Sequence, residues 1–299
     1  MVSQLIVSLK KSSSIYGSRV KILSPAKLNL YLNILGKYPN NSKFFGYHKI
    51  ESIIERISFF DEIYIEVKRK ADIALYSNNK YLVAENNLCL KAVKLIKKIY
   101  KIPYGFKIFL KKNIPVGAGL GGGSSNAAST LLGINALLNL KLSLAELYNC
   151  GQSLGSDVNF FLSQSPFAVV RGRGEKIEPF CGKILQHFII WPKINLSTAA
   201  VYETFNMKLT KFLSNVNILK YAITKGDLSL VQKNLYNALE KTASFICRPI
   251  KDIKAYFEKK GFHFLLTGSG SALFCIIEKK VKFPLATTSD FKFFYAKTF

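Results

Sequence analysis

The sequence is poor in acidic residues and has no paired cysteine motif. Of its 299 residues, 18 are Asp or Glu and 43 are Lys or Arg, which gives a formal net charge of +25. The five cysteines stand singly, without a Cys-x-x-Cys pair or a histidine at zinc-ligand spacing. The sequence therefore predicts neither a disulfide framework nor a structural metal site, and single thiols of this kind favour a cytoplasmic protein.

Long apolar runs are also absent. No stretch reaches the roughly 18 uncharged apolar residues that a membrane span needs, so we expect no membrane partner. Residues 1–19 carry a short apolar patch followed by Lys10 and Lys11. This is the reverse of the charge order in a secretory signal, and we interpret the segment as an N-terminal extension.

The basic residues form no block of five or six, although they are numerous. They occur in ones and twos along the chain, whereas a nucleic-acid footprint is typically clustered. A charge of +25 still raises the local concentration of any anionic partner, including a phosphorylated metabolite. We expect no nucleic-acid partner, and an RNA-binding α/β protein remains the rival interpretation from another functional class.

The chain has the apolar content of a folded protein. It is 49% hydrophobic and contains 23 Phe and 15 Tyr, and a length near 300 residues favours two domains. The pattern becomes richer in helices near residue 165, which predicts lobes at 20–165 and 166–299.

Apolar periodicity predicts the main helices and strands. We expect two strands within 53–67 that are separated by a turn at Asp61-Glu62, and helices that begin after Asn87 and at a Ser143 to Glu146 capping box. The other predicted strands are 20–34, 106–110, 167–170, 187–191, 262–266 and 272–277, and the other predicted helices are 126–140 and most of 215–260.

Five glycines fall within residues 117–123, between the strand 106–110 and a helix that opens with two serines. Glycine lets a ligand approach main-chain N–H groups closely, and the first turn of a helix offers unpaired donors and a positive dipole end. The segment therefore predicts a phosphate-binding loop.

Two well-known phosphate loops do not fit this segment. Gly117-x-Gly-x-x-Gly122 matches the dinucleotide fingerprint, but the acid required about 20 residues later on the next strand is missing. A Walker loop needs Lys after its last glycine, and Ser124-Ser125 stand there instead. What remains is an anion site at a helix start in which hydroxyl groups replace the lysine.

The run Pro115-x-Gly-x-Gly-Leu-Gly-Gly-Gly-Ser-Ser-Asn-Ala-Ala resembles the phosphate loop of the GHMP small-molecule kinases. The resemblance covers about residues 20–277 and is strongest to the branch that acts on a diphosphocytidyl sugar alcohol. Further segments that match this branch, in order, are Ser24 to Leu30, Gly46-Tyr-His48, Asn87-Leu88, Gly155-Ser-Asp-Val158, Ser197 to Tyr202 and Thr267-Gly-Ser-Gly-Ser271.

This resemblance implies an α+β, two-lobed GHMP-kinase fold with a ribosomal-protein-S5-like N-terminal lobe and an α/β-plait C-terminal lobe. It also implies ATP-dependent phosphorylation of the 2-hydroxyl of diphosphocytidyl methylerythritol in non-mevalonate isoprenoid precursor biosynthesis, by a monomer or weak homodimer. A GHMP kinase of the homoserine or mevalonate type is the alternative within the superfamily.

The resemblance implies two sets of binding residues. It also implies a Mg²⁺ ion that is held mostly by ATP, with Ser124 or Ser125 touching the ion or the phosphates. Residues 126–142 contain no Asp or Glu that would bind the metal. For ATP the set is Pro115, Gly117, Gly119, Leu120, Gly121, Gly122, Gly123, Ser124, Ser125, Asn87 and Lys112. For the acceptor substrate it is Asn29, Tyr47, His48, Thr198, Tyr202, Gly268 and Ser269, with Tyr47 and Tyr202 stacking on cytosine and His48 reading its edge.

Asp157 is the candidate catalytic base on chemical grounds as well. A carboxylate at a loop end can take the proton of an acceptor hydroxyl, and Asp157 lies between Gly155 and an apolar run. The alternative is an ordinary Asp that caps a short helix. Lys27 interrupts an apolar strand, and the resemblance implies that it holds Asp157 ionised; Asn29 lies on the same strand face.

Overall fold

The computed structural model describes residues 5–207, 215–278 and 291–299. Its contacts divide the chain into two units. The first unit contains residues up to 26, 59–114 and 121–164, and the second contains residues 27–58, 115–120 and 165–299. Two long strands, β2 (Arg19–Lys37) and β3 (His48–Lys68), therefore contribute residues to both units.

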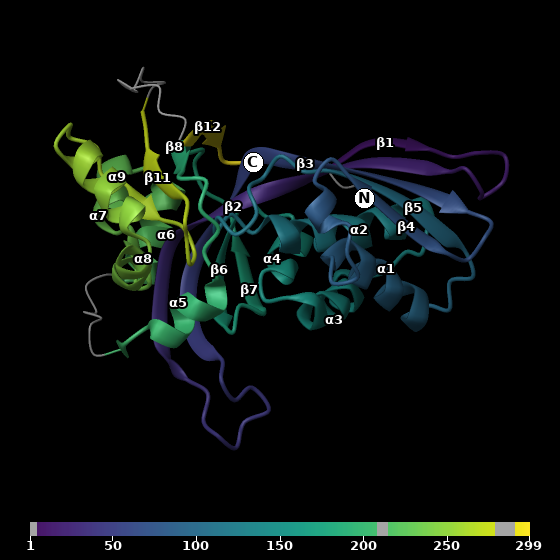
Figure 1. Cartoon of the computed structure of the whole chain (residues 1–299), viewed down its shortest axis with the longest axis horizontal. Helices are drawn as coiled ribbons and strands as arrows, with labels where there is room; N and C mark the ends of the chain where they lie inside the picture. The colour runs from purple at the N-terminus through teal and green to yellow at the C-terminus, as the bar shows by residue number, and fades with distance from the viewer. Residues whose placement is uncertain (1–4, 208–214, 279–290) are drawn as a thin grey trace. The chain divides into compact units, whose positions relative to one another are not determined.

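The first unit combines short strands with helices that contact one another (Figure 1). Its other elements are β1 (Ile6–Lys10), β4 (Ile73–Ser77), the 3₁₀ helix η1 (Lys80–Leu82), α1 (Leu88–Ile99), β5 (Gly105–Lys111), α2 (Gly122–Leu137), α3 (Leu144–Leu154) and α4 (Val158–Ser163). β1 pairs antiparallel with the start of β2, the end of β3 pairs antiparallel with β5, and β4 pairs parallel with β5.

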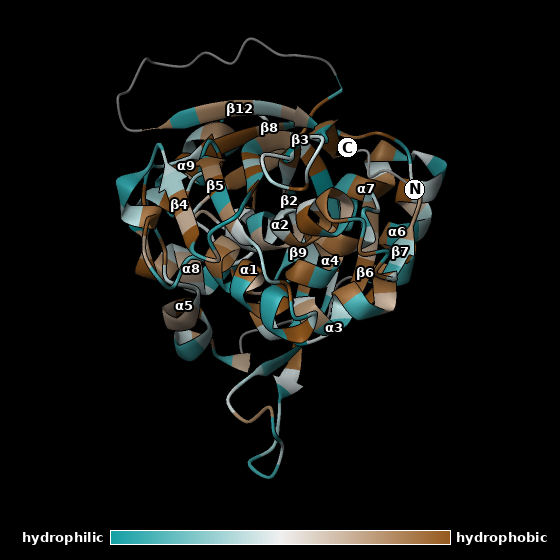
Figure 2. Cartoon of the chain, turned by 90° about the vertical axis from the view of Figure 1, so that its right-hand side faces the viewer, coloured by the Kyte–Doolittle hydropathy of each residue, from teal (hydrophilic) through white to brown (hydrophobic). Residues whose placement is uncertain are grey.

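Helix capping in this unit follows the sequence prediction. The Asn87 side chain accepts a hydrogen bond from Cys89 N at the start of α1, and Ser143 and Glu146 form the capping box of α3. α2 begins at Gly122, four residues earlier than predicted, because two glycines and two serines continue the helix toward its N-terminus. Most of α2 is buried, in agreement with its apolar sequence, whereas Figure 2 shows hydrophilic residues among the hydrophobic ones on α3.

Two segments differ from the prediction. β3 is a single strand of 21 residues, so the predicted turn at Asp61-Glu62 is wrong. The acidic pair resembled a turn signal, but Asp61 is fully buried and has partners distant in the sequence. In addition, the segment interpreted as an extension contains β1, which pairs with β2.

The second unit contains a four-stranded antiparallel sheet, in the order β10-β11-β8-β12, among its described residues. β6 pairs with the first part of β3 and with β7, and β9 pairs parallel with β2. The bounds are β6 (Phe167–Gly172), β7 (Lys176–Phe180), β8 (Gln186–Trp191), α5 (Thr198–Thr204), α6 (Val216–Lys225), α7 (Leu228–Lys233), β9 (Tyr236–Asn237), α8 (Glu240–Ile246), α9 (Arg248–Glu258), β10 (Leu265–Leu266), β11 (Leu273–Ile276) and β12 (Lys292–Lys297).

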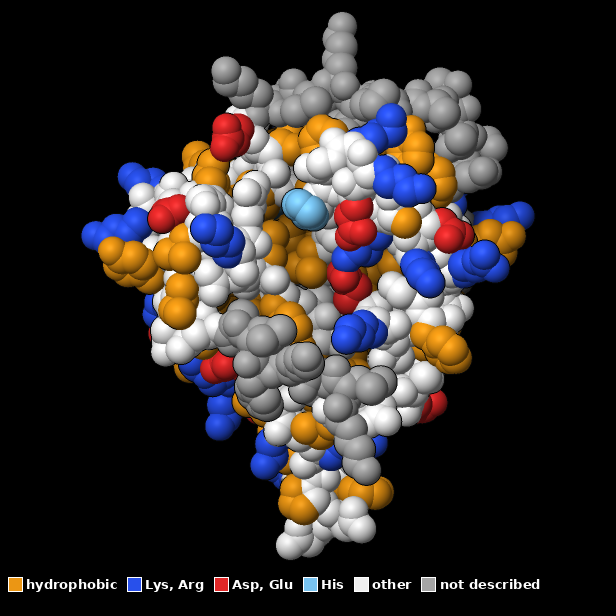
Figure 3. All heavy atoms as spheres, turned by 90° about the vertical axis from the view of Figure 1, so that its left-hand side faces the viewer, with side chains coloured by type: hydrophobic (Ala, Val, Ile, Leu, Met, Phe, Trp, Pro, Cys, Tyr) orange, Lys and Arg blue, Asp and Glu red, His pale blue; other side chains and the backbone are white. Residues whose placement is uncertain are grey.

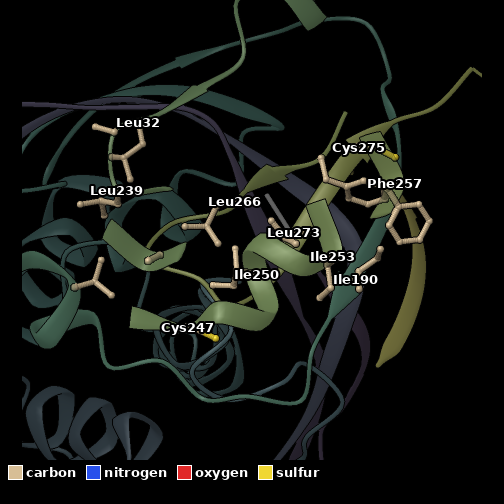
Figure 4. Close-up of a cluster of buried hydrophobic side chains, with 14 of the residues drawn as sticks. Leu32, Ile190, Leu239, Cys247, Ile250, Ile253, Phe257, Leu266, Leu273 and Cys275 are labelled. Carbon is tan, nitrogen blue, oxygen red and sulfur yellow. The ribbon is translucent and has the colours of Figure 1, made fainter. Parts of the chain in front are cut away.

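A hydrophobic core joins this sheet to the helices of the same unit (Figure 4). Ile250, Ile253 and Phe257 project from α9 at helical spacing and pack with Leu273 and Ile190 from the sheet. The predicted helical region 215–260 is confirmed, including its breaks near Gly226 and Pro249.

Candidate active site

The glycine loop contains the point in the sequence at which the chain passes from the second unit to the first. Residues 115–120 belong to the second unit, and Gly121 begins the part that belongs to the first. Gly117, Gly119 and Gly121 all have φ between 65° and 74°, in the left-handed region that glycine adopts most easily. The repeated glycines are therefore required by the backbone of the loop, in addition to any closeness to a ligand.

In the second unit, the loop packs on the Gly-Ser segment that follows β10. A Cβ on Gly119 would lie 2.1 Å from Thr267 O, so only glycine fits there. Ala272 N donates to Ala118 O at 3.1 Å, and Lys27 N donates to Leu120 O at 3.0 Å. Three segments distant in the sequence thus meet in one place.

Lys27 and Asn29 lie on one face of β2 in this cluster. Lys27 Nζ donates to Asn29 Oδ1, and both side chains are buried. Asn29 N donates to Thr267 Oγ1 at 3.0 Å, and Asn29 Nδ2 donates to Ser52 Oγ at 2.9 Å. Lys27 is therefore a buried lysine whose Nζ donates to an amide, and its side chain does not point to water.

The Gly-Ser segment supplies two of the predicted substrate residues. Gly268 (φ +57°) lies so close to Lys27 that a Cβ would be 3.1 Å from Nζ. The hydroxyls of Ser269 and Thr198 are 2.9 Å apart, which joins this segment to the start of α5. The structure thus brings Lys27, Asn29, Gly268, Ser269 and Thr198 together within one unit.

Another part of the second unit contains the predicted aromatic residues. The rings of His48 and Tyr202 are 5.2 Å apart between centroids, whereas Tyr47 is 51% exposed. Burial lowers the pKa of His48, with a smaller contribution from Lys37. His48 is therefore a neutral imidazole near pH 7, able to accept and donate hydrogen bonds.

In the first unit, the two serines at the start of α2 differ in their surroundings. The Ser125 hydroxyl is buried and accepts from Ser24 Oγ at 2.8 Å. Ser124 is partly exposed, and a Cβ on Gly155 would lie 3.5 Å from its hydroxyl. The segment that carries Asp157 thus lies beside Ser124.

Asp157 occupies the N-cap position of α4 but does not cap it. Its side chain makes no cap hydrogen bond, and the helix has six residues. The interpretation of Asp157 as an ordinary helix-capping residue therefore lacks the hydrogen bond that defines it. The catalytic assignment of Asp157 stays a prediction.

Sequence reasoning missed Asp61, which holds the flanks of the glycine loop. Its carboxylate accepts from Asn113 N at 2.7 Å and Ile114 N at 2.8 Å, just before the loop, and from Asn126 Nδ2 at 2.8 Å, just after it. Lys112 Nζ lies 2.5 Å from the same carboxylate. The sequence signal that could have indicated its buried role is the position of an acid within an alternating apolar run.

Asn87 and Lys112 both have partners within the first unit. Asn87 caps α1 and donates to Leu82 O at 2.8 Å. Burial lowers the pKa of Lys112, and the neighbouring Asp61 opposes this effect. A Cβ on Gly122 would lie 2.6 Å from Lys112 Nζ, so the ammonium lies against the start of α2. Their predicted contacts with ATP remain predictions.

Comparison with known proteins identifies the family. The GHMP kinases N terminal domain matches residues 87–165, and the GHMP kinases C terminal domain matches residues 219–283. The 4-diphosphocytidyl-2-C-methyl-D-erythritol kinase of Bacillus cytotoxicus is 35% identical over 267 residues, which cover 87% of this chain and 88% of the relative. The chain belongs to the 4-diphosphocytidyl-2-C-methyl-D-erythritol kinases, a branch of the GHMP kinases.

Solved structures confirm the GHMP-kinase fold predicted from the sequence. A crystal structure of 4-(cytidine 5'-diphospho)-2C-methyl-D-erythritol kinase matches with a TM-score of 0.72 and 29% identity, over 86% of this chain and 90% of that chain. The L. major mevalonate kinase, in complex with R-mevalonate, matches with a TM-score of 0.69 over 99% and 98% of the two chains. Its 17% identity shows the fold alone.

Two further observations concern the described part of the chain. Among the residues that the structure describes, no group of three or more His, Cys, Asp or Glu side chains is arranged to hold a metal ion. No helix in the described ranges combines the length and apolar character that a membrane span requires.

Proposed function

We propose that this kinase transfers the γ-phosphoryl group of ATP to the 2-hydroxyl of 4-diphosphocytidyl-2-C-methyl-D-erythritol, giving the 2-phosphate and ADP. The main support is the 35% identity, over 87% of the chain, to a relative named 4-diphosphocytidyl-2-C-methyl-D-erythritol kinase. Several segments of the chain also resemble motifs of that branch, and five of the residues named from them form one cluster in the second unit.

In this proposal, the glycine loop and the start of α2 bind the ATP phosphates. The partly exposed Ser124 suits contact with a phosphate or with Mg²⁺ carried by ATP, whereas the Ser125 hydroxyl is already engaged with Ser24. When bound, Mg²⁺ would neutralise charge on the β- and γ-phosphate oxygens. Ser124 is therefore the better candidate of the two serines.

The acceptor hydroxyl needs a group that takes its proton. Asp157 has that role in this proposal. The buried side chain of Lys27 is assigned to orienting the acceptor, as the family resemblance implies.

The cytosine is recognised by the aromatic residues in this proposal. Tyr47 presents a half-exposed ring, and His48 is held against Tyr202. Stacking of a base on an aromatic ring is worth roughly 1–3 kcal/mol, enough to favour a substrate that carries a base over homoserine or mevalonate. We further propose that the protein works in the cytoplasm, since its five cysteines are free thiols. A monomer or weak homodimer is the oligomeric state that the family resemblance implies.

The test is ADP release by the full chain with each candidate acceptor and Mg²⁺-ATP. We expect turnover with the diphosphocytidyl substrate and none with homoserine or mevalonate. Turnover with either of the latter, and none with the former, would contradict the proposal.

Asp157→Asn tests the assigned base in the same assay. It keeps the shape of the side chain but cannot take a proton, so we expect turnover to fall by at least about 10³-fold while ATP affinity changes less than threefold. Asp227→Asn, which changes an exposed helix cap, is the matched control and should keep its turnover. Retention of more than a tenth of the turnover by Asp157→Asn would remove Asp157 from the chemistry.

A further inference from the structure

The segment between β2 and β3 has almost no hydrophobic anchor of its own. None of the side chains at residues 35–47 is buried, and Phe45 and Tyr47 are 62% and 51% exposed. Backbone hydrogen bonds within the segment, such as Tyr38 N to Tyr47 O at 3.0 Å, form its turns. These bonds do not determine where the Tyr47 ring points.

Arg173 contacts the Tyr47 ring and can fix its orientation. It stands in the turn between β6 and β7, and its guanidinium carbon lies 4.1 Å from the centroid of the Phe44 ring and 5.2 Å from that of Tyr47. Its side chain is 17% exposed, although arginine is usually solvated. One guanidinium thus contacts two rings of the segment.

The hairpin turn fixes Arg173 in this position. Glu175 accepts from Arg173 N at 2.7 Å, and its carboxylate is 3.8 Å from Arg173 Nε. Gly172 has φ +78°, and a Cβ there would lie 2.6 Å from the Glu175 carboxylate. The guanidinium is therefore held at its base, and Arg173 Nε is buried without a hydrogen-bond partner. The same guanidinium lies over the Phe44 and Tyr47 rings.

We propose that Arg173 is a positioning residue that presets the Tyr47 ring for the base of the substrate. This inference rests on the proposed function. A planar guanidinium stacks on aromatic rings, and a ring that is already ordered loses less conformational freedom when a base stacks on it. Arg173 acts through Tyr47 and therefore affects binding of the cytidyl substrate, not of ATP.

The test compares steady-state kinetics of the full chain with Arg173→Met and Arg173→Lys. We expect the KM for the diphosphocytidyl substrate to rise about tenfold in Arg173→Met, while kcat and the KM for ATP change less than twofold. In Arg173→Lys the KM for the diphosphocytidyl substrate should rise less, about threefold, because an ammonium keeps the charge but has no planar group that stacks on the rings. Arg248→Met is the matched control, since that side chain is 89% exposed.

A double-mutant cycle separates positioning of Tyr47 from a general structural role. In the background of Tyr47→Ala, Arg173→Met should raise the KM for the cytidyl substrate less than twofold, because the ring it positions is gone. The same tenfold rise in that background, or an unchanged KM in the single variant, would overturn the inference. If Arg173→Met does not fold, Arg173→Lys carries the same cycle.

Failure of the inference and of the proposed function are distinguishable. A parent enzyme that turns over the cytidyl substrate, with an Arg173→Met variant that behaves identically, overturns only the role of Arg173. A parent with no turnover of that substrate overturns the proposed function and this inference with it.

Discussion

Asp61 is a buried carboxylate with four donors, two of them from the backbone that leads into the glycine loop. Its partner Lys112 is also buried, with 7% of the side chain exposed. Removal of one member of a buried ion pair leaves the other charge uncompensated, which costs more than the pair contributes. Loss of the Asp61 carboxylate should therefore cost more free energy of unfolding than loss of an exposed acid nearby.

Asp61→Asn should lower the free energy of unfolding by about 3 kcal/mol, because Lys112 then has a buried charge without a counter-ion. Urea unfolding measures this. The adjacent Glu62→Gln is the matched control: Glu62 pairs with Lys21 and Lys111 nearer the solvent, and its loss should cost less than about 1 kcal/mol. Equal losses in the two variants would show that burial of the Asp61 pair is unimportant.

His48 gives a pH dependence at the residue scale. Because burial lowers its pKa below 6.5, the folded protein binds a proton on His48 less readily than the unfolded chain does. The His48 contribution to stability is therefore fully present above pH 6.5 and is lost as the pH falls below that value.

The same titration should affect binding of the substrate. We expect the KM for the diphosphocytidyl substrate to be constant from pH 8 to 6.5 and to rise at lower pH, when His48 gains a proton and its acceptor is lost. His48→Gln, which cannot titrate, should show a flat profile, with the KM for ATP as an internal reference. A rise of the same size in His48→Gln would assign the dependence to another group.

At the scale of elements, glycine is needed for different reasons in the glycine loop and in α2. In the loop a side chain would not fit, and in α2 a side chain would keep a ligand from the backbone. A Cβ on Gly119 meets backbone at 2.1 Å, and φ is +74°. A Cβ on Gly123 meets only Leu88 Cδ1 at 3.5 Å, an ordinary contact. Gly123 nevertheless stands exposed in the first turn of α2, where a phosphate would approach the backbone.

Gly119→Ala should therefore lower the free energy of unfolding by about 2 kcal/mol or more, because the loop must distort. Gly123→Ala should raise stability by up to about 1 kcal/mol through helix propensity and yet weaken ATP binding at least fivefold. Thermal unfolding and ATP titration on the same samples measure both. Unchanged ATP affinity in Gly123→Ala would show that phosphate does not approach this turn.

The same elements show what local sequence can and cannot predict. The caps at Asn87 and Ser143, the buried character of α2 and the helices of 215–260 are set by neighbouring residues, and the sequence predicted them. β3 was divided wrongly, because the partners of Asp61 lie about 50 and 65 residues away and nothing beside it indicates them. β7 was missed for a similar reason: it forms by pairing with β6, although its residues are mostly exposed.

The candidate site was likewise predicted only in part. Sequence motifs predicted which residues belong to it, but not which of those residues contact one another. Lys27, Asn29 and Gly268 are in one cluster because the cluster is tied by the backbone of Leu120 and the hydroxyl of Thr267, and such contacts leave no periodic signal. Arg173 carries no motif at all, and only its position over two rings indicates a role.

At the scale of the whole molecule, the excess of basic residues is the main unexplained property. Figure 3 shows Lys and Arg side chains distributed singly over one face, among acidic, polar and hydrophobic ones. A surface for RNA would depend on a continuous basic patch. We expect RNA to bind weakly, with an affinity that collapses between 50 and 200 mM salt and is unaffected by Asp157→Asn. Tight RNA binding that persists at 200 mM salt would favour the RNA-binding alternative.

The net charge of +25 should instead act on the rate at which anionic substrates arrive. Raising KCl from 20 to 300 mM shortens the screening length to less than 10 Å, so kcat/KM for ATP should fall about threefold or more, while kcat changes less than twofold. Sucrose at matched osmolality, with Mg²⁺ kept saturating, is the control for viscosity and water activity. A kcat/KM that does not respond to salt would mean that the basic residues act only as solvated surface, because scattered charges whose fields cancel at the site cannot steer a substrate toward it.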